Sequence, residues 1–366
     1  MQRYLNIAFF AFLIAAFLTP IIRALAFRLG ILDHPKAHGI HTKPVPRMGG
    51  LAIYIAFVIG SLYLMDLSEM LKGVLVASSL IFAIGLMDDW IHLRASVKLA
   101  GQLIACGIMM FKYGVILHLF QNIFLDAFFT VLGVIGLTNA VNFLDNMDGL
   151  AAGLVMISSF TIAVVGESTH QAWLIYLSMS LAGAAAGFLL FNLRKAYVFM
   201  GDAGSTFLGF TLASLAVMCE WSYHWSVTMA APILILGVPI LDMILITVLR
   251  IKEDKVRNFK EWIDYAGKDH LSHRFMRLGL GKRGAVFFLW AIQSLFGLLA
   301  LFIMPRGLGW GIFALGVFGI LTAAVIFFFR KKRSIVLRVN GRKPRKRSAH
   351  ERRSAHSAPE RSEVLS

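Results

Sequence analysis

The chain has 366 residues, of which 58% are hydrophobic and only 15% are charged. A water-soluble globule of this size needs more polar residues to cover its surface, so this composition excludes a soluble fold. In a membrane protein, the formal net charge of +16 indicates cytoplasmic loops rich in Lys and Arg and contact with anionic lipid. We therefore expect an integral membrane protein.

Apolar stretches long enough to cross a bilayer recur along most of the chain. A helix needs roughly 20 apolar residues to cross the hydrocarbon, and about eleven stretches meet this requirement. The first stretch is too long for a removable signal peptide and is better explained as the first span. We predict an all-α integral membrane protein with spans near residues 4–27, 51–66, 73–88, 98–117, 123–142, 149–165, 171–190, 204–220, 227–249, 284–304 and 307–329.

The distribution of Lys and Arg predicts the orientation of these spans, because short loops rich in them stay on the cytoplasmic side. With about eleven spans, the loops on one side hold only Arg3, Lys72, Lys112 and Arg306, and the loops on the other side hold the rest of the 36. We predict a multi-pass protein of the cell inner (cytoplasmic) membrane, with the N-terminus outside and the C-terminus cytoplasmic.

Residues 331–366 form a separate compositional unit, with twelve Lys or Arg, three Glu and few apolar residues. We expect them to be a disordered basic cytoplasmic tail that follows a polytopic membrane catalytic domain of residues 1–330. A basic cluster beside a membrane attracts anionic lipid, by about 1 kcal/mol per charge. Nucleic-acid binding is the alternative, but the tail has no aromatic residues to stack on bases, so we expect no nucleic acid.

Two acidic motifs lie at the ends of predicted spans. Asp88 and Asp89 end the third span, where the helix dipole and their mutual repulsion are both unfavourable. A cation should compensate them, either a protein side chain or a metal with a substrate phosphate, unless the motif is only a solvated helix end. Asp202, beside Gly201, opens the eighth span and could be its N-cap. Alternatively, free N–H groups there could bind a phosphate and the carboxylate could hold Mg²⁺.

A third polar motif occupies residues 139–150, between two apolar runs. Asn139, Asn142, Asp145 and Asp148 follow one another at three-residue steps. If the stretch is helical, these side chains lie along one slowly turning face, which packing does not explain. Asp148 alone could instead cap the next span.

Two basic segments carry candidates for phosphate recognition. The loop 250–283 contains His270, His273 and Arg274. A histidine pair at this spacing can bind a transition metal, but the adjacent Arg274 and the lack of nearby Cys favour a phosphate ligand over zinc; a solvated loop is the alternative. In residues 41–50, Lys43 and Arg47 flank two prolines in a rigid basic loop, which could also serve topology alone.

Taken in chain order, these motifs resemble the polyprenyl-phosphate N-acetylhexosamine-1-phosphate transferase superfamily, which includes the bacterial undecaprenyl-phosphate GlcNAc-1-phosphate transferases of glycosyltransferase family 4 type. The resemblance runs from about His41 to Gly279 through Pro-Arg-Met-Gly-Gly, Asp-Asp, Asn-Ala-x-Asn-x-x-Asp-x-x-Asp-Gly-Leu, Phe-x-Met-Gly-Asp-x-Gly-Ser and the His loop. It implies transfer of a sugar-1-phosphate, GlcNAc-1-phosphate above all, from a UDP-sugar to undecaprenyl phosphate with release of UMP. The product would be the first lipid-linked intermediate of a cell-envelope polysaccharide, such as a lipopolysaccharide O-antigen or a teichoic acid.

The resemblance also implies roles for individual residues. Asp202 and Asp88 would hold Mg²⁺, for which Mn²⁺ can substitute, and Asp88 and Asp89 would lie beside the lipid phosphate. The uridine nucleotide and the pyrophosphate would be held by the remaining motifs. The implied catalytic residues are Asp88, Asp89, Asp145, Asp148 and Asp202, and the implied substrate-binding residues are Lys43, Arg47, Asn142, Asn192, Phe199, His270, His273 and Arg274.

The chain departs from the family pattern at three positions. Asn146 replaces a usual glycine, Lys195 stands where a proline often follows Asn192, and Ser272 interrupts a more His-rich motif. The last departure favours the UDP-GlcNAc-using branch, or a related one, over the muramyl-pentapeptide branch. The expected partners are a UDP-sugar, polyprenyl (undecaprenyl) phosphate and anionic membrane lipid, and a homodimer stays open.

A multi-span secondary transporter is the alternative from another functional class. Asp242 lies inside the ninth predicted span, where a carboxylate usually faces protein or a polar cavity, and either a structural partner or a substrate contact would explain it. Transporters usually bind near the membrane midplane, on broken helices within repeated halves. Here most carboxylates lie at span ends and no half is duplicated, which favours an enzyme with one cytoplasmic site.

Overall fold

The computed structural model describes residues 2–33, 44–62, 68–193, 196–258, 261, 265, 267 and 269–339. Their secondary structure is helical except for two short antiparallel strands, β1 (Leu32–Asp33) and β2 (Val45–Pro46). The predicted all-α class is therefore confirmed. Helices are the expected solution in lipid, because each one satisfies its backbone N–H and C=O groups internally.

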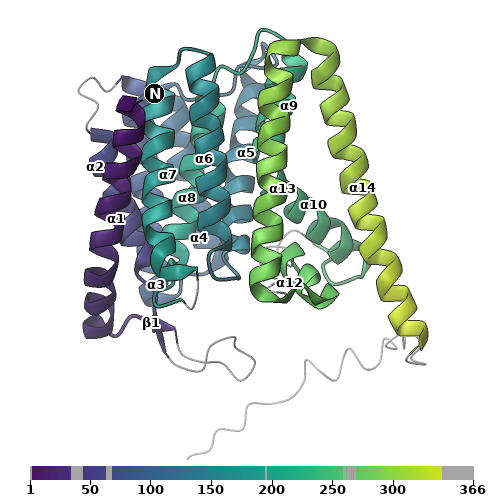
Figure 1. Cartoon of the computed structure of the whole chain (residues 1–366), viewed down its shortest axis with the longest axis horizontal. Coiled ribbons are helices and arrows are strands. Elements are labelled where there is room, and N and C mark those ends of the chain that lie inside the picture. The colour runs from purple at the N-terminus through teal and green to yellow at the C-terminus, as the bar shows by residue number, and fades with distance from the viewer. Residues whose placement is uncertain are drawn as a thin grey trace, which may run out of the picture.

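The helices stand roughly side by side (Figure 1). In chain order they are α1 (Gln2–Leu29), α2 (Gly49–Leu62), α3 (Glu69–Ile91), α4 (Ala95–Gly107), α5 (Ile123–Leu144), α6 (Leu150–Ser168), α7 (Ala172–Asn192), α8 (Gly201–Met218), α9 (Trp225–Ile235), α10 (Gly237–Lys252), α12 (Leu271–Phe275), α13 (Gly281–Ile303) and α14 (Leu308–Val339). Short π-helical segments follow α4 and α12, at Ile108–Lys112 and Met276–Leu280, and a 3₁₀ turn at Met304–Arg306 follows α13.

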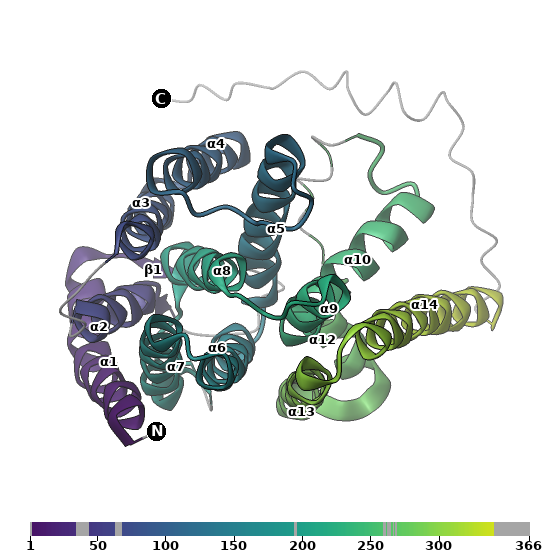
Figure 2. The same cartoon turned by 90° about the horizontal axis from the view of Figure 1, so that it is seen from above.

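Helix α8 lies at the centre of the N-terminal group of helices (Figure 2). It packs against α2, α3, α5, α6 and α7, and nearly all of its side chains are buried. Its Gly, Ser and Thr residues suit this position, because small residues let membrane helices approach closely. The central helix therefore carries its N-terminal Asp202 to the middle of one end of the bundle.

Eight helices of the described chain are long and apolar enough to cross a membrane, and the bent pair α9 and α10 would make a ninth span. The two other predicted stretches correspond to α2, which has 14 residues in the structure, and to the buried α8. Every predicted stretch thus contains a helix, while the count of about eleven spans stays a prediction that depends on α2 and α8.

The prediction of one continuous span over residues 227–249 was wrong. The chain breaks between α9 and α10, and the two helices meet at an angle of 81°. Pro239, in the first turn of α10, has no N–H to donate to Ile235, and its ring clashes with a continuing helix. Gln293 and Ser158 instead donate to the Ile235 carbonyl, and Gln293 accepts from the N–H of Val238. Neighbouring helices thus satisfy the backbone groups that the break frees.

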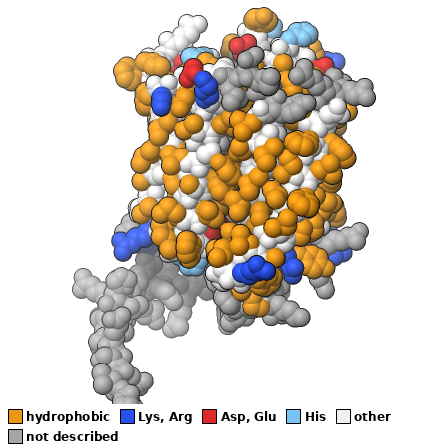
Figure 3. All heavy atoms as spheres, turned by 90° about the vertical axis from the view of Figure 1, so that its left-hand side faces the viewer, with side chains coloured by type: hydrophobic (Ala, Val, Ile, Leu, Met, Phe, Trp, Pro, Cys, Tyr) orange, Lys and Arg blue, Asp and Glu red, His pale blue; other side chains and the backbone are white. Residues whose placement is uncertain are grey.

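The outer surface fits a lipid environment. Figure 3 shows a broad belt of hydrophobic side chains, with Lys and Arg gathered toward the upper and lower rims. On α1, Phe9 and Phe17 are 61% and 70% exposed, which is expected of side chains that face lipid. The N-terminus of α1 and the C-terminal end of α14 lie at opposite ends of the bundle (Figure 1), while the assignment of these ends to the two sides of the membrane stays a prediction.

Helix α14 continues to Val339, beyond the boundary that we placed at residue 330. Helix-favouring Lys, Arg and Leu residues follow that position in the sequence, which accounts for the extension. The predicted disorder of the remaining tail concerns residues 340–366, which lie outside the described part of the chain.

Candidate active site

The ends of α3 and α8 bring three of the predicted carboxylates together. Asp88 and Asp89 lie in the last turn of α3, and Asp202 lies in the first turn of α8. The buried Asp89 accepts hydrogen bonds from the backbone N–H groups of Asp202 at 2.9 Å and Ala203 at 3.0 Å. Its charge therefore faces the positive end of the α8 dipole, which offsets its unfavourable place at the end of α3.

This arrangement corrects two expectations about the start of α8. The N–H groups that we expected to be free for a phosphate are taken by Asp89. Asp202 is not the N-cap, a position that Met200 occupies. The Asp202 carboxylate is consequently left to interact with groups outside its own helix.

Glycine is required where α8 meets its neighbours. Gly201 has φ +76°, and a Cβ there would lie 2.4 Å from Oδ2 of Asp89 and 2.7 Å from the carbonyl oxygen of Arg47. On α3, a Cβ at Gly85 would lie 2.5 Å from the Cα of Ala203. Any larger residue at these positions would push α3 and α8 apart, so the Gly-Asp motif at 201–202 serves close packing rather than an open phosphate site.

Lys98 is the cation that we expected beside the paired carboxylates. It lies in the first turn of α4, and its Nζ is 2.9 Å from Oδ2 of Asp88 and 2.8 Å from Oδ2 of Asp202. The other oxygen of Asp88 accepts from the N–H of Leu93 at 2.7 Å, which fixes the turn between α3 and α4. Lys98 was absent from the predicted site; its place shortly after the Asp-Asp pair was the signal that could have indicated it.

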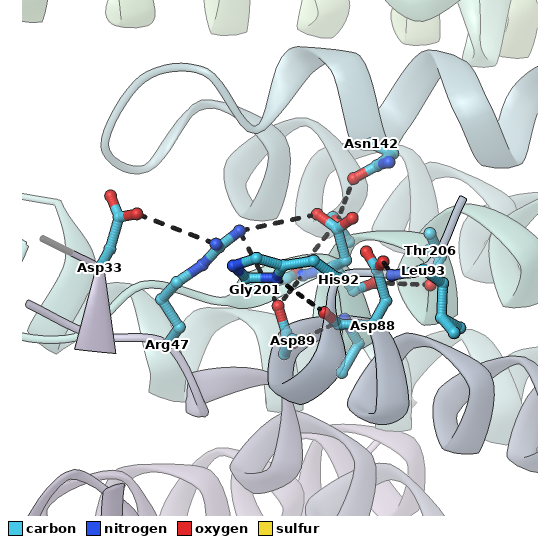
Figure 4. Close-up of polar contacts among 12 residues, drawn as sticks. Asp33, Arg47, Asp88, Asp89, His92, Leu93, Asn142, Gly201 and Thr206 are labelled. Carbon is cyan, nitrogen blue, oxygen red and sulfur yellow. Dashed lines mark hydrogen bonds and ion pairs between the residues drawn. The ribbon is translucent and has the colours of Figure 1, made fainter. Parts of the chain in front are cut away.

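Arg47 approaches the same carboxylates from the segment between β2 and α2. Its guanidinium nitrogens lie 3.8 Å from Asp89, 3.9 Å from Asp202 and 3.8 Å from Asp33, and Figure 4 shows it between Asp33 and the end of α3. These distances are those of ion pairs without direct hydrogen bonds. Two cations, Lys98 and Arg47, therefore face the predicted carboxylates.

The expectation of one helical face through residues 139–148 was wrong. Helix α5 ends at Leu144, with Asp145 as its C-cap, and Asp148 lies in the following turn. The side chain of Asn146 donates to the carbonyl of Phe143 at 2.7 Å, which helps to end the helix. Gly149, at φ +78°, is the N-cap of α6, so the alternative in which Asp148 is the N-cap is also excluded.

The polar residues of this segment divide between the site and the scaffold. Asn142 accepts a hydrogen bond from the Oγ of Ser205 at 2.6 Å, which joins α5 to the first turns of α8 near Asp202. Asn139 donates instead to the buried Gln102 at 2.8 Å and thereby pairs α5 with α4. Asn142 therefore lies beside the carboxylates, whereas Asn139 serves helix packing.

Asp145 is electrostatically coupled to the cluster at the ends of α3 and α8. Protein atoms surround this partly accessible carboxylate, and the loss of hydration raises its pKa well above the usual range. The charge of Asp202 raises this pKa further, and that of Arg47 lowers it. A cation bound nearby would favour the ionised form of Asp145.

The residues expected to hold the nucleotide lie beside the α5–α6 turn and β2. Asn192 is buried and accepts from the N–H of Gly149 at 2.6 Å, while its amide donates to the carbonyl of Val198 at 3.0 Å. The N–H of Phe199 donates to the carbonyl of Pro46 at 2.7 Å. Lys43 and Lys195 lie outside the described residues. The structure thus gives Asn192 a role in shaping the site, and its predicted contact with uridine stays a prediction.

Residues 269–274 of the final His loop are buried rather than solvated. His270, the N-cap of the short helix α12, and His273, within that helix, are 6% and 7% exposed. Nδ1 of His270 lies 2.7 Å from one oxygen of Asp242, and the other oxygen accepts from the N–H of Leu271 at 2.6 Å. Of the two explanations for Asp242, the structure therefore supports the structural one. Its partners are His270 and the N–H of Leu271, and these contacts fix the start of α12.

A second ion pair fastens the loop before α12. Arg250, at the end of α10, donates from Nε and a terminal nitrogen to the two carboxylate oxygens of Asp269, at 2.9 and 2.8 Å. Burial alone would raise the pKa of Asp269, but the hydrogen bonds and charge of Arg250 outweigh it and lower the pKa. Arg274 donates to the carbonyl of Asp269 at 2.6 Å and lies 5.4 Å from the ring centre of Phe329 on α14, so its predicted phosphate contact stays a prediction.

The donor groups present are suited to Mg²⁺. Among the described residues, no group of three or more His, Cys, Asp or Glu is arranged to hold a metal ion. Mg²⁺ seldom needs such a cage, because it usually binds one or two carboxylates together with water and substrate phosphate. Asp88 and Asp202 both direct an oxygen to the ammonium of Lys98, at 2.9 and 2.8 Å. Two carboxylates thus converge on one positive charge.

Comparison with known proteins gives a consistent set of relatives. Residues 71–220 match glycosyl transferase family 4. A probable undecaprenyl-phosphate N-acetylglucosaminyl 1-phosphate transferase of Bacillus subtilis (strain 168) is 35% identical over 294 residues, which cover 78% of this chain and 80% of the relative. Decaprenyl-phosphate N-acetylglucosaminephosphotransferase of Mycobacterium tuberculosis (strain ATCC 25618 / H37Rv) is 32% identical over 339 residues, or 81% of this chain and 82% of the relative. Phospho-N-acetylmuramoyl-pentapeptide-transferase of Caldicellulosiruptor bescii is 32% identical over 295 residues, or 74% and 86%.

Proposed function

We propose that this chain, which belongs to glycosyl transferase family 4, transfers a sugar-1-phosphate from a UDP-sugar to a polyprenyl phosphate and releases UMP. The observation that carries the proposal is the convergence of Asp88, Asp89 and Asp202 with Lys98 and Arg47 at one end of an apolar helical bundle. Carboxylates and cations in this arrangement suit the transfer of a charged phosphate group next to a lipid surface.

The reaction forms a bond between an oxygen of the lipid phosphate and the β-phosphorus of the donor. The bond from that phosphorus to the bridging oxygen breaks, and the oxygen leaves as part of UMP. A phosphate monoester has its second pKa near ~6, so most of the acceptor is dianionic at neutral pH and needs no strong base. Catalysis then rests on positioning and on neutralising charge, as in other phosphoryl transfers.

We assign the carboxylates different roles. Asp88 and Asp202 would hold Mg²⁺, which, when bound, would neutralise charge on the pyrophosphate. Both oxygens of Asp89 accept from the start of α8, so Asp89 is a positioning residue that holds Asp202 in place. The place beside the lipid phosphate that the family pattern implies for Asp88 and Asp89 stays a prediction.

Two cations and the α5–α6 turn complete the proposed site. Arg47 and Lys98 would bind phosphate oxygens once substrate separates them from the carboxylates. The electrostatic coupling of Asp145 to Asp202 and Arg47 supports a donor pocket at the turn. The site would face the cytoplasm, because the Lys- and Arg-rich loops lie at this end of the predicted spans.

UDP-GlcNAc is the donor to test first, because the Bacillus and Mycobacterium relatives are named as N-acetylglucosamine-phosphate transferases. Purified protein in detergent is incubated with UDP-GlcNAc, undecaprenyl phosphate and Mg²⁺, and UMP is measured. We expect UMP release that requires the lipid phosphate and stops with excess chelator. UMP that forms equally well without the lipid would indicate a hydrolase, and no release with either UDP-GlcNAc or UDP-N-acetylmuramoyl-pentapeptide would contradict the proposed function.

A further inference from the structure

Two of the positions at which the chain departs from its family pattern are in direct contact. The hydroxyl of Ser272, on α12, donates to the side-chain oxygen of Asn146, in the α5–α6 turn, at 2.8 Å. Ser272 is fully buried, so its hydroxyl depends on a protein partner, which the partly buried Asn146 supplies. A glycine at 146, the usual family residue, has no side chain with which to form it.

Asn146 is oriented at both ends of its amide. Its nitrogen donates to the carbonyl of Phe143 at the end of α5, at 2.7 Å, and its oxygen accepts from Ser272. The residue lies between Asp145 and Asp148 in the sequence, so its orientation and that of the turn are linked. The contact therefore joins the end of α5 and the acidic turn to α12.

Helix α12, by contrast, is fastened to the rest of the molecule by charged groups. Asp242 holds His270 and the N–H of Leu271, and Arg250 holds Asp269. Ser272 lies between His270 and His273 in the sequence. Because α12 is held firmly from the α10 side, the bond to Asn146 transmits its position to the turn with Asp145 and Asp148.

We propose that Asn146 and Ser272 form a clamp that sets the spacing between the carboxylates of the α5–α6 turn and the histidines of α12, and thereby tunes affinity for the UDP-sugar donor. The clamp rests on the proposed function, which places the donor at the α5–α6 turn, and on the family pattern, which implies that His270 and His273 bind substrate. Neither residue is required to touch substrate, so both are positioning residues. Both depart from the family pattern, and each supplies the hydrogen-bond partner of the other.

A double-mutant cycle tests the clamp. The variants are Ser272→Ala, Asn146→Ala and their combination, with UMP release measured at saturating undecaprenyl phosphate. We expect each single substitution to raise KM for UDP-GlcNAc about fivefold, the effect of losing one hydrogen bond, with kcat nearly unchanged. The KM of the double variant should be no higher than that of the more affected single variant, because the two substitutions remove the same hydrogen bond.

Three further variants separate positioning from a loss of fold. Ser272→Thr keeps the hydroxyl and should restore KM. Asn146→Gly introduces the usual family residue, and should fold while it shows the raised KM. Ser158→Ala removes another buried hydroxyl, which donates from α6 to the carbonyl of Ile235 at the end of α9, at 2.7 Å; the melting temperature of this variant should fall while KM is unchanged.

The outcomes are distinguishable. Three results would overturn the clamp: additive effects of the two substitutions on KM, a loss of kcat without a change in KM, or an equal change of KM in Ser158→Ala. In each case, activity of the wild-type protein would leave the proposed function standing. A folded wild-type protein that neither binds nor uses the donor would overturn both.

Discussion

At the scale of single residues, the ammonium of Lys98 lies between the two carboxylates that we propose as metal ligands. It is 2.9 Å from Asp88 and 2.8 Å from Asp202. An opposite charge this close stabilises both carboxylates and keeps them pointed at one place. Asp202 is thus prepared to receive a divalent cation, and its neutral amide should fail to do so.

The substitution Asp202→Asn should therefore lower kcat for UMP release at least about a hundredfold, as the loss of an essential charged group at a metal does. The melting temperature should change little, since the amide keeps an oxygen for Lys98. Asp254→Asn is a matched control, because Asp254 is exposed and asparagine tolerates its φ of +52°. Normal turnover by Asp202→Asn would refute the metal assignment.

The Arg250–Asp269 pair predicts how stability depends on pH. The folded-state pKa of Asp269 is lowered. The ionised carboxylate therefore stabilises the folded protein above the unfolded pKa of about 3.9, and this stabilisation is lost as pH falls through the folded pKa. At pH 7, Asp269→Asn should melt lower than wild type by on the order of 5 °C. The difference should shrink between roughly pH 5 and pH 3; a difference that stays constant would exclude the pair as its source.

The identity of the site residues was more predictable than their partners. Asp88, Asp145 and Asp202 stood out because charged groups at the ends of apolar stretches have few structural explanations. Lys98 and Ser205 could not be matched to Asp202 and Asn142, since each contact spans many residues of sequence. Packing of α3, α4, α5 and α8 creates these contacts, and one sequence carries no direct signal for such pairings.

At the scale of helices and turns, the close approach of α3 to α8 depends on Gly201. Its φ of +76° disfavours any side chain, and a Cβ would also lie 2.4 Å from Asp89. Both effects act at the position that presents Asp202 to the site. The helix start should therefore be intolerant even of alanine.

Gly201→Ala should lower the melting temperature and abolish most of the turnover. Gly114→Ala is the matched control, because Gly114 also has a positive φ, +71°, but its Cβ would meet nothing within 4 Å. The control should lose only the roughly 1–2 kcal/mol that a positive φ costs a residue with a side chain. Equal losses in the two variants would show that contact with Asp89 is unimportant.

Helices were predicted well and their breaks poorly. Long apolar stretches identify helices in lipid with little ambiguity, and each predicted stretch contains one. The bend between α9 and α10 depends on side chains from neighbouring helices. Ser158 and Gln293 donate to the freed carbonyl of Ile235, and Gln293 also accepts from the freed N–H of Val238. Proline and glycine near residue 237 indicated a weak point, but only tertiary packing determines whether the helix breaks there.

At the scale of the whole molecule, the site residues lie at one end of the bundle, and we predict that this end faces the cytoplasm. Single cysteines can report this once the buried Cys106 and Cys219 are replaced. A cysteine at Tyr197, which is 60% exposed near the start of α8, should resist an impermeant reagent applied to the outside of cells. A cysteine at Tyr223, between α8 and α9 at the opposite end, should react; the reverse pattern would invert the topology.

The most direct test of the proposed activity follows the phosphorus rather than the sugar. UDP-GlcNAc labelled with ³²P at the β-phosphate is incubated with the purified protein, Mg²⁺ and undecaprenyl phosphate, and the lipid is extracted into organic solvent. If a sugar-1-phosphate is transferred, the label moves into the lipid in step with unlabelled UMP in the aqueous phase. If the label stays in the aqueous phase as UDP while sugar enters the lipid, the protein transfers the sugar alone and the proposed reaction is wrong.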